Sequence, residues 1–417
     1  MTSVKWWEKA VFYELYIDKF AGNLEGLRRR LGYLAELGIT CVHVLPFYPS
    51  PMADDGYDVS DYMGIRPELG TLEDFEDFIK DARARGMKVM IDFVLNHTSV
   101  EHPWFKEARP DKLSPKRDFY LWSQTGEELK GSTNVFSETK HGAWMRNRER
   151  EDFYYSTFYP EQVDLNWENP EVFSEMMKVL NFWANLGVQL FRLDAVSHLI
   201  KKEGTDSKNL PETHDVVKRI RRYVDSRWGD VALVAEVHES VEKSAAYFGA
   251  GDECQLVYNF PLAEEFFLAL IRNDEGRLWK TAEQSSKIPA DCRWLGFLRN
   301  HDNLSLATLS LEDKEEILRV LDPEGVLKFG NGVSARLGTA FRGHPEKIKK
   351  AFLLLSWVCR AYPIRPVIYY GDEIGMENEA VSPNEKDTRR AVRGFFDWEK
   401  TERELKNPSP LFTGFAA

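Results

Sequence analysis

The sequence predicts an α/β fold in which eight parallel strands alternate with helices and close into a (β/α)8 barrel. Three observations support this prediction. Short apolar runs alternate with amphipathic stretches along nearly all of the 417-residue chain, a pattern typical of βα units. Eight of these runs read as strands. Several of them end in carboxylates, arginine or histidine, at the place where such a barrel carries its functional groups.

The predicted strands are short and rich in β-branched and aromatic residues. They are Val11–Ile17, Cys41–Pro46, Lys88–Val94, Leu190–Val196, Ala232–Val237, Gln255–Phe260, Leu295–Arg299 and Pro366–Tyr370. Apolar residues at helical spacing predict helices between them. These helices are Leu24–Leu37, Leu72–Arg85, Pro170–Leu186, Pro211–Arg227 and Pro345–Arg360. Pro170 and Pro211 suit a first helical turn, and Gly38, Gly86 and Gly187 suit positions just past a helix end.

One interval breaks the alternation. Thr98–Val163 is too long for a barrel loop and carries many aromatic side chains, such as Trp104, Trp122 and Trp144. Long loops in compact domains are usually functional or form a small subdomain. We therefore expect residues 98–163 to form a lid subdomain inserted after the third strand, with residues 1–97 and 164–417 forming the barrel.

Composition narrows the class of partner. A net charge of −12 and a pI near 5.4 disfavour nucleic acid, which requires a basic face. No apolar run reaches about 18 residues, so we expect no membrane span. The opening MTSVKWWEKAVF lacks the features of a signal peptide, which favours the cytoplasm. The four cysteines have no paired spacing and are expected to be buried thiols.

Four segments carry the residues suited to chemistry, each at the end of a predicted strand. They are Val89–His97 (VMIDFVLNH), Leu190–His198 (LFRLDAVSH), Leu233–Glu239 (LVAEVHE) and Gly296–Asn303 (GFLRNHDN). In a parallel barrel, the carboxyl ends of the strands share one face. Paired carboxylates with an arginine and histidines at that face suit reactions at glycosidic bonds.

In this order, the four segments resemble the α-amylase family, glycoside hydrolase family 13. The resemblance covers nearly the whole chain and includes DDGYD at Asp54–Asp58 and QVDLN at Gln162–Asn166. Within the family, the chain most resembles the trehalose synthases, which interconvert maltose and trehalose. The stretches shared with that group are Asp54–Asp61, Gly204–His214, Gly251–Cys254, Phe297–Asp302 and Val367–Met376.

The resemblance implies three catalytic carboxylates in a retaining mechanism. Asp194 would be the nucleophile, Glu236 the general acid and base, and Asp302 a third acid that binds sugar hydroxyls. Arg192 lies two residues before Asp194 on the same strand, so both project to one side. An adjacent guanidinium favours the ionised carboxylate that a nucleophile needs. The apolar strand around Glu236 would favour the protonated form that an acid needs.

The resemblance also implies a set of side chains that bind the sugar: Asp54, Tyr57, His97, Arg192, His301 and Arg389. Tyr57 would present an aromatic face, and the two histidines would hold hydroxyls. Asp54 and Arg389 would hold the far end of the glucose and close the pocket to longer chains. The implied substrates are therefore small α-glucosides such as maltose and trehalose. Arg390 is a rival to Arg389 for this role.

No cofactor is needed for this chemistry, but the resemblance implies a structural calcium. Its ligands would be Asn96, Asp164 and backbone oxygens near His198 and Leu199, because calcium prefers oxygen ligands. Trehalose synthases carry an acidic residue close behind, where this chain has Lys201. A lysine ammonium could take the place of the cation, so the sequence leaves calcium open.

The chain departs from the trehalose synthases at three places. Asn303 replaces a glutamate, Val237–Glu239 differs, and the loop Asp18–Gly26 is short and lacks an acidic metal-binding pattern. An α-glucosidase-type hydrolase, or an enzyme that transfers glucose to another acceptor, is therefore the alternative. A non-catalytic binding scaffold is disfavoured because the three carboxylates are all present.

The C-terminus is short for this family, whose members normally continue into a β-sandwich. Only Arg393–Ala417 follow the segment of Arg389, and Leu411–Ala417 resembles the start of an outer helix. A barrel without its eighth helix exposes apolar surface. We expect either a truncated chain or a partner subunit, such as a second copy in a homo-oligomer, that covers this face.

Overall fold

The predicted barrel is present. The computed structural model describes residues 4–137, 139–382 and 385–406. Its main sheet is a closed barrel with the strand order β1-β16-β12-β11-β10-β9-β3-β2. These strands are β1 (Phe12–Leu15), β2 (Cys41–Val44), β3 (Lys88–Val94), β9 (Leu190–Asp194), β10 (Ala232–Ala235), β11 (Leu256–Tyr258), β12 (Arg293–Phe297) and β16 (Ile364–Tyr369). Each predicted strand overlaps one of them, so the (β/α)8 fold class is confirmed.

The five predicted helices are also confirmed, with ends that agree to within two residues. They are α2 (Leu24–Glu36), α3 (Leu72–Ala84), α5 (Pro170–Leu186), α6 (Pro211–Asp225) and α12 (Pro345–Ala361). Pro170 and Pro211 open their helices, because a first-turn residue needs no N–H partner. Gly187 ends α5 in the left-handed conformation, with a φ of 113° that glycine adopts without strain.

The region between β11 and α12 contains helices that the sequence did not predict. They are α8 (Phe260–Arg272), α9 (Gly276–Gln284), α10 (Leu311–Leu321) and α11 (Leu337–Ala340). All residues from Phe260 to Ala269 are buried. A small sheet of β13 (Leu304–Ser305), β15 (Gly332–Val333) and β14 (Lys328–Phe329) was also missed.

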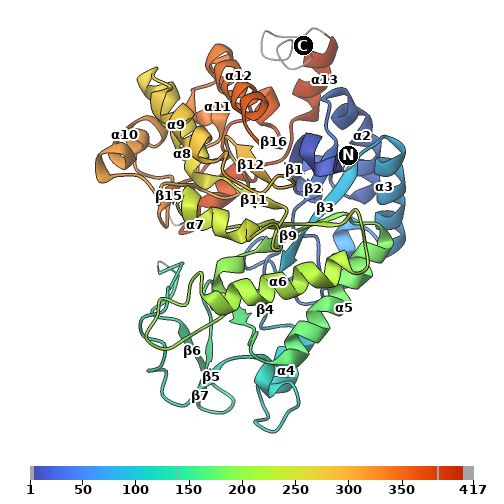
Figure 1. Cartoon of the computed structure of the whole chain (residues 1–417), viewed down its shortest axis with the longest axis vertical. Coiled ribbons are helices and arrows are strands. Elements are labelled where there is room, and N and C mark those ends of the chain that lie inside the picture. Colours follow the sequence, from blue (N-terminus) through green and yellow to red (C-terminus); the bar gives the residue numbers. More distant parts are fainter. Residues whose placement is uncertain (1–3, 138, 383–384, 407–417) are drawn as a thin grey trace. The chain divides into compact units, whose positions relative to one another are not determined.

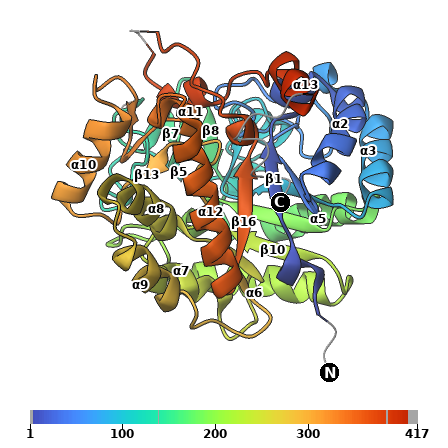
Figure 2. The ribbon, with the colours of Figure 1, turned by 90° about the horizontal axis from the view of Figure 1, so that it is seen from above.

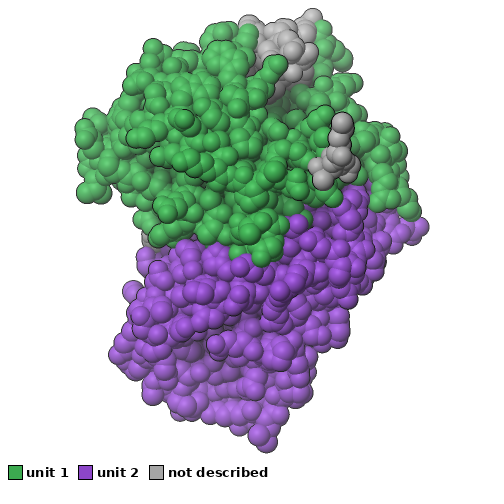
Figure 3. Space-filling view, viewed as in Figure 1, with its two compact units in different colours: residues 1–45, 80–89, 237–417 green, residues 46–79, 90–236 purple. Residues whose placement is uncertain are grey.

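Two compact units make up the chain (Figure 3). Unit 1 consists of residues 1–45, 80–89 and 237–417. It contains β1, β2, β11, β12 and β16, and helix α12 runs alongside β16 (Figure 2). Buried aromatic side chains such as Trp294 fill its core. Leu353 and Trp357 of α12 are exposed, and the apolar face expected near the C-terminus stays a prediction.

Unit 2 consists of residues 46–79 and 90–236. It contains β9, β10, most of β3 and the whole interval 98–163. At the root of this interval, β4 (His97–Ser99) pairs with β8 (Gln162–Asp164), and His97 is opposite Asp164. Within it, the helix α4 (Pro103–Ala108) accompanies an antiparallel sheet of β5 (Trp122–Ser123), β7 (Asp152–Tyr155) and β6 (Trp144–Asn147) (Figure 1). Its role as a lid stays a prediction.

Strand register brings charged side chains together inside each unit. In unit 1, Glu14 of β1 is in register with His43 of β2. In unit 2, Asp92 of β3 is in register with Arg192 of β9. All four side chains are buried. Charged groups are rarely this buried unless they are paired. In each case, two neighbouring strands supply one partner each.

Three further expectations concern the chain as a whole. The four cysteines are buried and free, as predicted. Among the described helices, none combines the length and apolar character needed to cross a bilayer.

After β16 the described residues contain short 3-10 helices and α13 (Trp398–Lys406). The predicted helix start at Leu411–Ala417 lies outside the described residues. The remaining short helices are α1 (Ile17–Ala21) and α7 (Val241–Ala245).

Candidate active site

Arg192 is the centre of a buried polar cluster in unit 2. Its Nη1 binds Asp92 and lies 2.9 Å from Oδ1 of Asp194, and its Nη2 lies 2.5 Å from Oε1 of Glu236. Burial alone would lower the pKa of Arg192, but the carboxylates of Asp92, Glu236 and Asp194 outweigh it and raise the pKa well above its usual value. One guanidinium therefore holds three carboxylates.

Local structure explains why these groups meet. Asp194 is the last residue of β9, and Glu236 follows directly after β10. Arg192 and Asp194 are two apart on one strand and therefore project to the same face. Ala195 then adopts a left-handed conformation with a φ of 48°, and its N–H donates to Oε2 of Glu236 at 3.1 Å. Such backbone strain in a residue other than glycine is typical of functional sites.

Tyr57 joins the same cluster. Its hydroxyl donates to Oδ1 of Asp92 at 3.3 Å and accepts from Nη1 of Arg192 at 3.3 Å. His97 donates from Nε2 to the carbonyl oxygen of Tyr57 at 3.2 Å. Burial lowers the pKa of His97 to about 4, so its ring is neutral at pH 7. Asp54 accepts a hydrogen bond from Nε2 of Gln162 at 3.0 Å.

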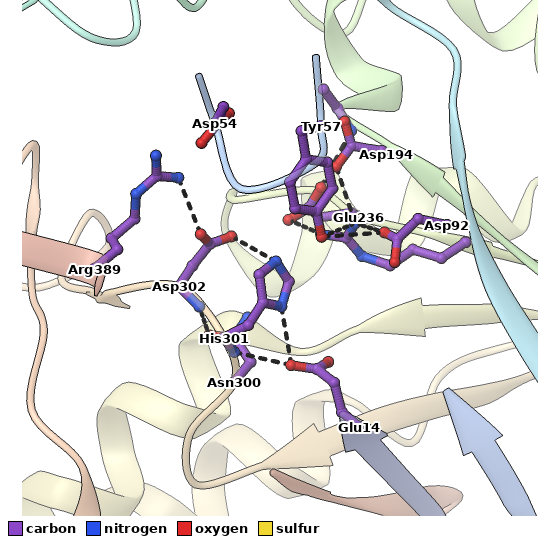
Figure 4. A network of polar contacts seen from close by, with 12 residues as sticks. Glu14, Asp54, Tyr57, Asp92, Asp194, Glu236, Asn300, His301, Asp302 and Arg389 are labelled. Atoms are coloured by element: carbon purple, nitrogen blue, oxygen red, sulfur yellow. Dashed lines mark hydrogen bonds and ion pairs between the residues drawn. The ribbon is translucent and has the colours of Figure 1, made fainter. Parts of the chain in front are cut away.

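Asp302 forms a second polar cluster, in unit 1. Its Oδ1 accepts from Nη1 of Arg389 at 3.0 Å and from Nη2 of Arg393 at 2.8 Å. Its Oδ2 lies 3.2 Å from Nε2 of His301 (Figure 4). Burial would raise the pKa of Asp302, but these three cationic neighbours outweigh it and hold the pKa well below its usual range. Asp302 is therefore ionised.

The structure separates the arginines that the sequence left as rivals. Arg389 is buried and also binds Asp387, with 2.7 Å between Nη2 and Oδ2. Arg390 is exposed. Arg393, which the sequence did not predict, binds Asp302 directly and donates from Nε to the carbonyl oxygen of His301 at 2.9 Å. The sequence shows Arg393 only as one more arginine close to Arg389. Its burial in the structure distinguishes it from the exposed Arg390.

Glu14 and His43 were also missed. Glu14 binds both the backbone N–H and the ring of His301, and its other oxygen lies 3.2 Å from Nδ1 of His43. The signal was a glutamate in the middle of an otherwise apolar strand, Phe12–Leu15. A charged residue in such a strand requires a buried partner, although the sequence does not identify that partner.

The proposed calcium ligands are already bound to a lysine. Nζ of Lys201 lies 2.9 Å from Oδ1 of Asn96 and 2.6 Å from Oδ2 of Asp164, and it also binds the carbonyl oxygen of His198. Burial would raise the pKa of Asp164, but the Lys201 ammonium outweighs it and lowers the pKa. These residues therefore do not fit a calcium ion. Among the described residues, no three or more His, Cys, Asp or Glu side chains are grouped so that they could hold a metal ion.

Comparisons with known proteins agree with the fold. The sequence model for the catalytic domain of α-amylases matches residues 12–322. A trehalose synthase from Thermus thermophilus is 42% identical over 379 residues, which cover 89% of this chain and 39% of that protein. A trehalose synthase from Pimelobacter sp. (strain R48) is 38% identical over 388 residues, which cover 89% of this chain and 67% of that protein.

A solved structure gives the same fold. The crystal structure of an α-glucosyl transfer enzyme has a TM-score of 0.76 with 24% identity, covering 100% of this chain and 84% of that one. At this identity the likeness concerns the fold alone. The chain spans 39% of the length of its relative from T. thermophilus.

Proposed function

Because the chain belongs to the α-amylase family of enzymes, we propose that it acts on small α-glucosides by a retaining, double-displacement mechanism. The observation that carries this proposal is the shared contact of Asp194 and Glu236 with Arg192. A single guanidinium that binds both carboxylates supports the short separation, about 5–5.5 Å, that retaining enzymes use.

The first half of the reaction breaks the glycosidic bond. A carboxylate oxygen of Asp194 attacks the anomeric carbon, while the bond from that carbon to the leaving oxygen breaks. Glu236 gives its proton to the leaving oxygen. Contact with Arg192 keeps Asp194 in the ionised form that attack requires. With Asp92, three carboxylates share one guanidinium.

The second half releases the glucosyl group from Asp194. Glu236, now ionised, takes a proton from a sugar hydroxyl or from water, and the resulting oxygen attacks the anomeric carbon. The ester bond to Asp194 breaks and the carboxylate is regenerated. We assign Asp302, His301 and Arg389 to hydroxyl binding, because an ionised carboxylate held by cations offers fixed acceptors and donors. We assign Asp54, Tyr57 and His97 to the same task.

The favoured overall reaction is the interconversion of maltose and trehalose. Both relatives described above are named trehalose synthases. Isomerisation requires the free glucose to turn and to be used as acceptor before water reaches the glucosyl ester. We propose that residues 98–163 exclude water during this step, because an enclosed site prevents hydrolysis of a reactive intermediate.

Hydrolysis of short α-glucosides is the second candidate, and two departures favour it. Asn303 replaces the glutamate of trehalose synthases, and its Nδ2 donates to the carbonyl oxygen of Phe329 at 3.0 Å. His238, two residues after Glu236, stacks on Phe260 with 3.6 Å between ring centroids. Both side chains are thus fixed at positions where this chain departs from the trehalose synthases. We infer that these positions affect how the acceptor is bound.

The test is incubation with maltose while trehalose and glucose are quantified over time, with Asp194→Asn as the inactive control. We expect trehalose to form faster than glucose. If glucose forms without trehalose, the chain is a hydrolase and not an isomerase. If maltose is left unchanged while a different α-glucoside is consumed, the proposed substrate is wrong. Turnover by the Asp194→Asn control equal to that of the unmodified chain would overturn the mechanism.

We also propose that Lys201 removes any need for calcium. A chelator should leave the thermal midpoint and the activity unchanged. Lys201→Ala should cost about 3–5 kcal/mol of stability, because it leaves the Asp164 carboxylate buried without its cation. In that variant, added calcium should restore part of the loss, since the oxygens of Asn96 and Asp164 become free to bind it.

The matched control for this prediction is Lys202→Ala. Lys202 is exposed and pairs with Glu212 at the surface, where water screens the pair, so its loss should leave the thermal midpoint nearly unchanged. The measurement is the thermal midpoint of the unmodified chain, Lys201→Ala and Lys202→Ala, each with and without chelator or added calcium. A wild-type midpoint that falls by several degrees in chelator would contradict the proposal.

A further inference from the structure

Glu14 connects β1 to the loop that carries Asp302. Its Oε1 accepts two hydrogen bonds from one residue, from the backbone N–H of His301 at 2.8 Å and from Nδ1 of the same histidine at 2.9 Å. Its Oε2 lies 3.2 Å from Nδ1 of His43. All three side chains are at most 1% exposed. Glu14 therefore restrains both the main chain and the ring of His301.

The ring of His301 lies between two carboxylates. Nδ1 faces Glu14, and Nε2 faces Oδ2 of Asp302 at 3.2 Å. An ionised carboxylate only accepts hydrogen bonds, so both ring nitrogens must carry a proton, and the ring is an imidazolium. The charges within this cluster balance, because Glu14, Asp302 and Asp387 are offset by His301, Arg389 and Arg393.

We propose that Glu14 is a positioning residue for Asp302, acting through His301. Removing the charge of Glu14 would leave His301 with one carboxylate partner, and the hydrogen bond from Nε2 to Asp302 would lose the charge that strengthens it. Asp302 would then be held mainly by its arginines, through Oδ1. The proposal rests on the role of Asp302 in the proposed function, and it adds a residue on another strand that touches no substrate.

The electrostatics of His301 agree with this geometry. Burial alone would lower the pKa of His301, but Asp302 and Glu14 outweigh it and raise the pKa to about 9. Tyr16 also packs against the ring, with 6.1 Å between ring centroids, and Arg393 binds the carbonyl oxygen of His301. His43 contacts Glu14. The stabilising effect of this imidazolium is thus complete below about pH 6.5 and is lost as the pH rises through 9.

The test compares Glu14→Gln with Glu373→Gln. Glu373 is an equally buried glutamate of unit 1, held by the hydroxyls of Tyr13 and Tyr33 at 2.7 Å each, and it has no bond to His301 or Asp302. Loss of a supporting hydrogen bond around a reacting group typically costs about 10- to 100-fold in activity. We therefore expect Glu14→Gln to lower kcat by that factor with little change in KM, and Glu373→Gln to keep kcat within about threefold.

A second readout needs no substrate. In ¹⁵N NMR, the ring signals of His301, assigned by their loss in His301→Gln, should show an imidazolium at pH 7.5 in the unmodified chain. In Glu14→Gln the same ring should lose its proton at a lower pH. A neutral His301 in the unmodified chain would overturn the proposal even if Glu14→Gln fails to fold. Equal kcat in the two glutamine variants would also overturn it.

The two readouts keep this inference separate from the proposed function. The kinetic comparison uses whichever α-glucoside the unmodified chain consumes, so a failure of maltose isomerisation leaves it valid. The NMR comparison stands even if no substrate is found. An effect on kcat without any change in the His301 titration would show that Glu14 acts by another route, and the proposal would be wrong.

Discussion

Replacing Asp194 by asparagine should reduce turnover of any α-glucoside by a factor on the order of 10⁴ to 10⁶, the loss typical when a covalent nucleophile is removed. The amide cannot attack the anomeric carbon, whereas its oxygen can still accept the hydrogen bond that Nη1 of Arg192 donates at 2.9 Å. Folding should therefore be retained. Because three carboxylates share that guanidinium, loss of one negative charge should leave the thermal midpoint equal or higher.

The measurement is the initial rate on maltose beside the thermal midpoint of each protein. Asp225→Asn is the matched control, since Asp225 is an exposed partner of Arg221 on α6 and the chemical change is the same. That control should keep full activity. A slowly released fluorinated glucosyl donor should in addition label the peptide that carries Asp194 in the unmodified chain. Residual activity above about 1% in Asp194→Asn would be incompatible with its role as nucleophile.

The second large effect concerns stability. Arg192→Met should destabilise the chain by about 3–5 kcal/mol, the cost of leaving buried carboxylates without their cation. The side chain of Arg192 is only 2% exposed and contacts Asp92, Asp194 and Glu236. Methionine has a similar length and no charge, so lost packing contributes little. Activity should be lost as well, because Asp194 loses the guanidinium that keeps it ionised.

Arg29→Met provides the control for this prediction. Arg29 also pairs with a carboxylate, Glu25, but its side chain is 74% exposed. Water screens such a pair, and its loss should cost no more than about 1 kcal/mol. The midpoints of urea unfolding of the three proteins measure the difference. If the two arginine variants shift the midpoint equally, the Arg192 cluster does not stabilise the fold as its burial implies.

The eight barrel strands and the five predicted helices could be read from the sequence because their signals are local. α5 was predicted with both of its ends, since Pro170 opens it and Gly187 closes it. α8 was missed; the expected strand Gln255–Phe260 runs up to its first residue, and its residues from Phe260 to Ala269 are all buried. The small sheet of β13, β14 and β15 consists of two-residue strands, which are too short to produce an alternating pattern.

For the candidate site, the sequence supplied residue types at strand ends but few partners. Resemblance singled out Asp194, Glu236 and Asp302, and their roles stay predictions. Lys201 was named as a substitute for calcium, and the structure shows its Nζ on the oxygens that calcium would use. Glu14 and Arg393 were not named, because each contacts a residue far away in the sequence.

The sequence by itself determined the eight strands, the main surface helices and the family, because all of these depend on short patterns and motifs read in order. Only the tertiary structure decided which charges are partners. Register in the barrel pairs Glu14 with His43 and Asp92 with Arg192, and burial separates Arg389 and Arg393 from the exposed Arg390. Pairing of this kind arises when distant segments meet away from water, where an unpaired charge is costly, and no local pattern encodes it.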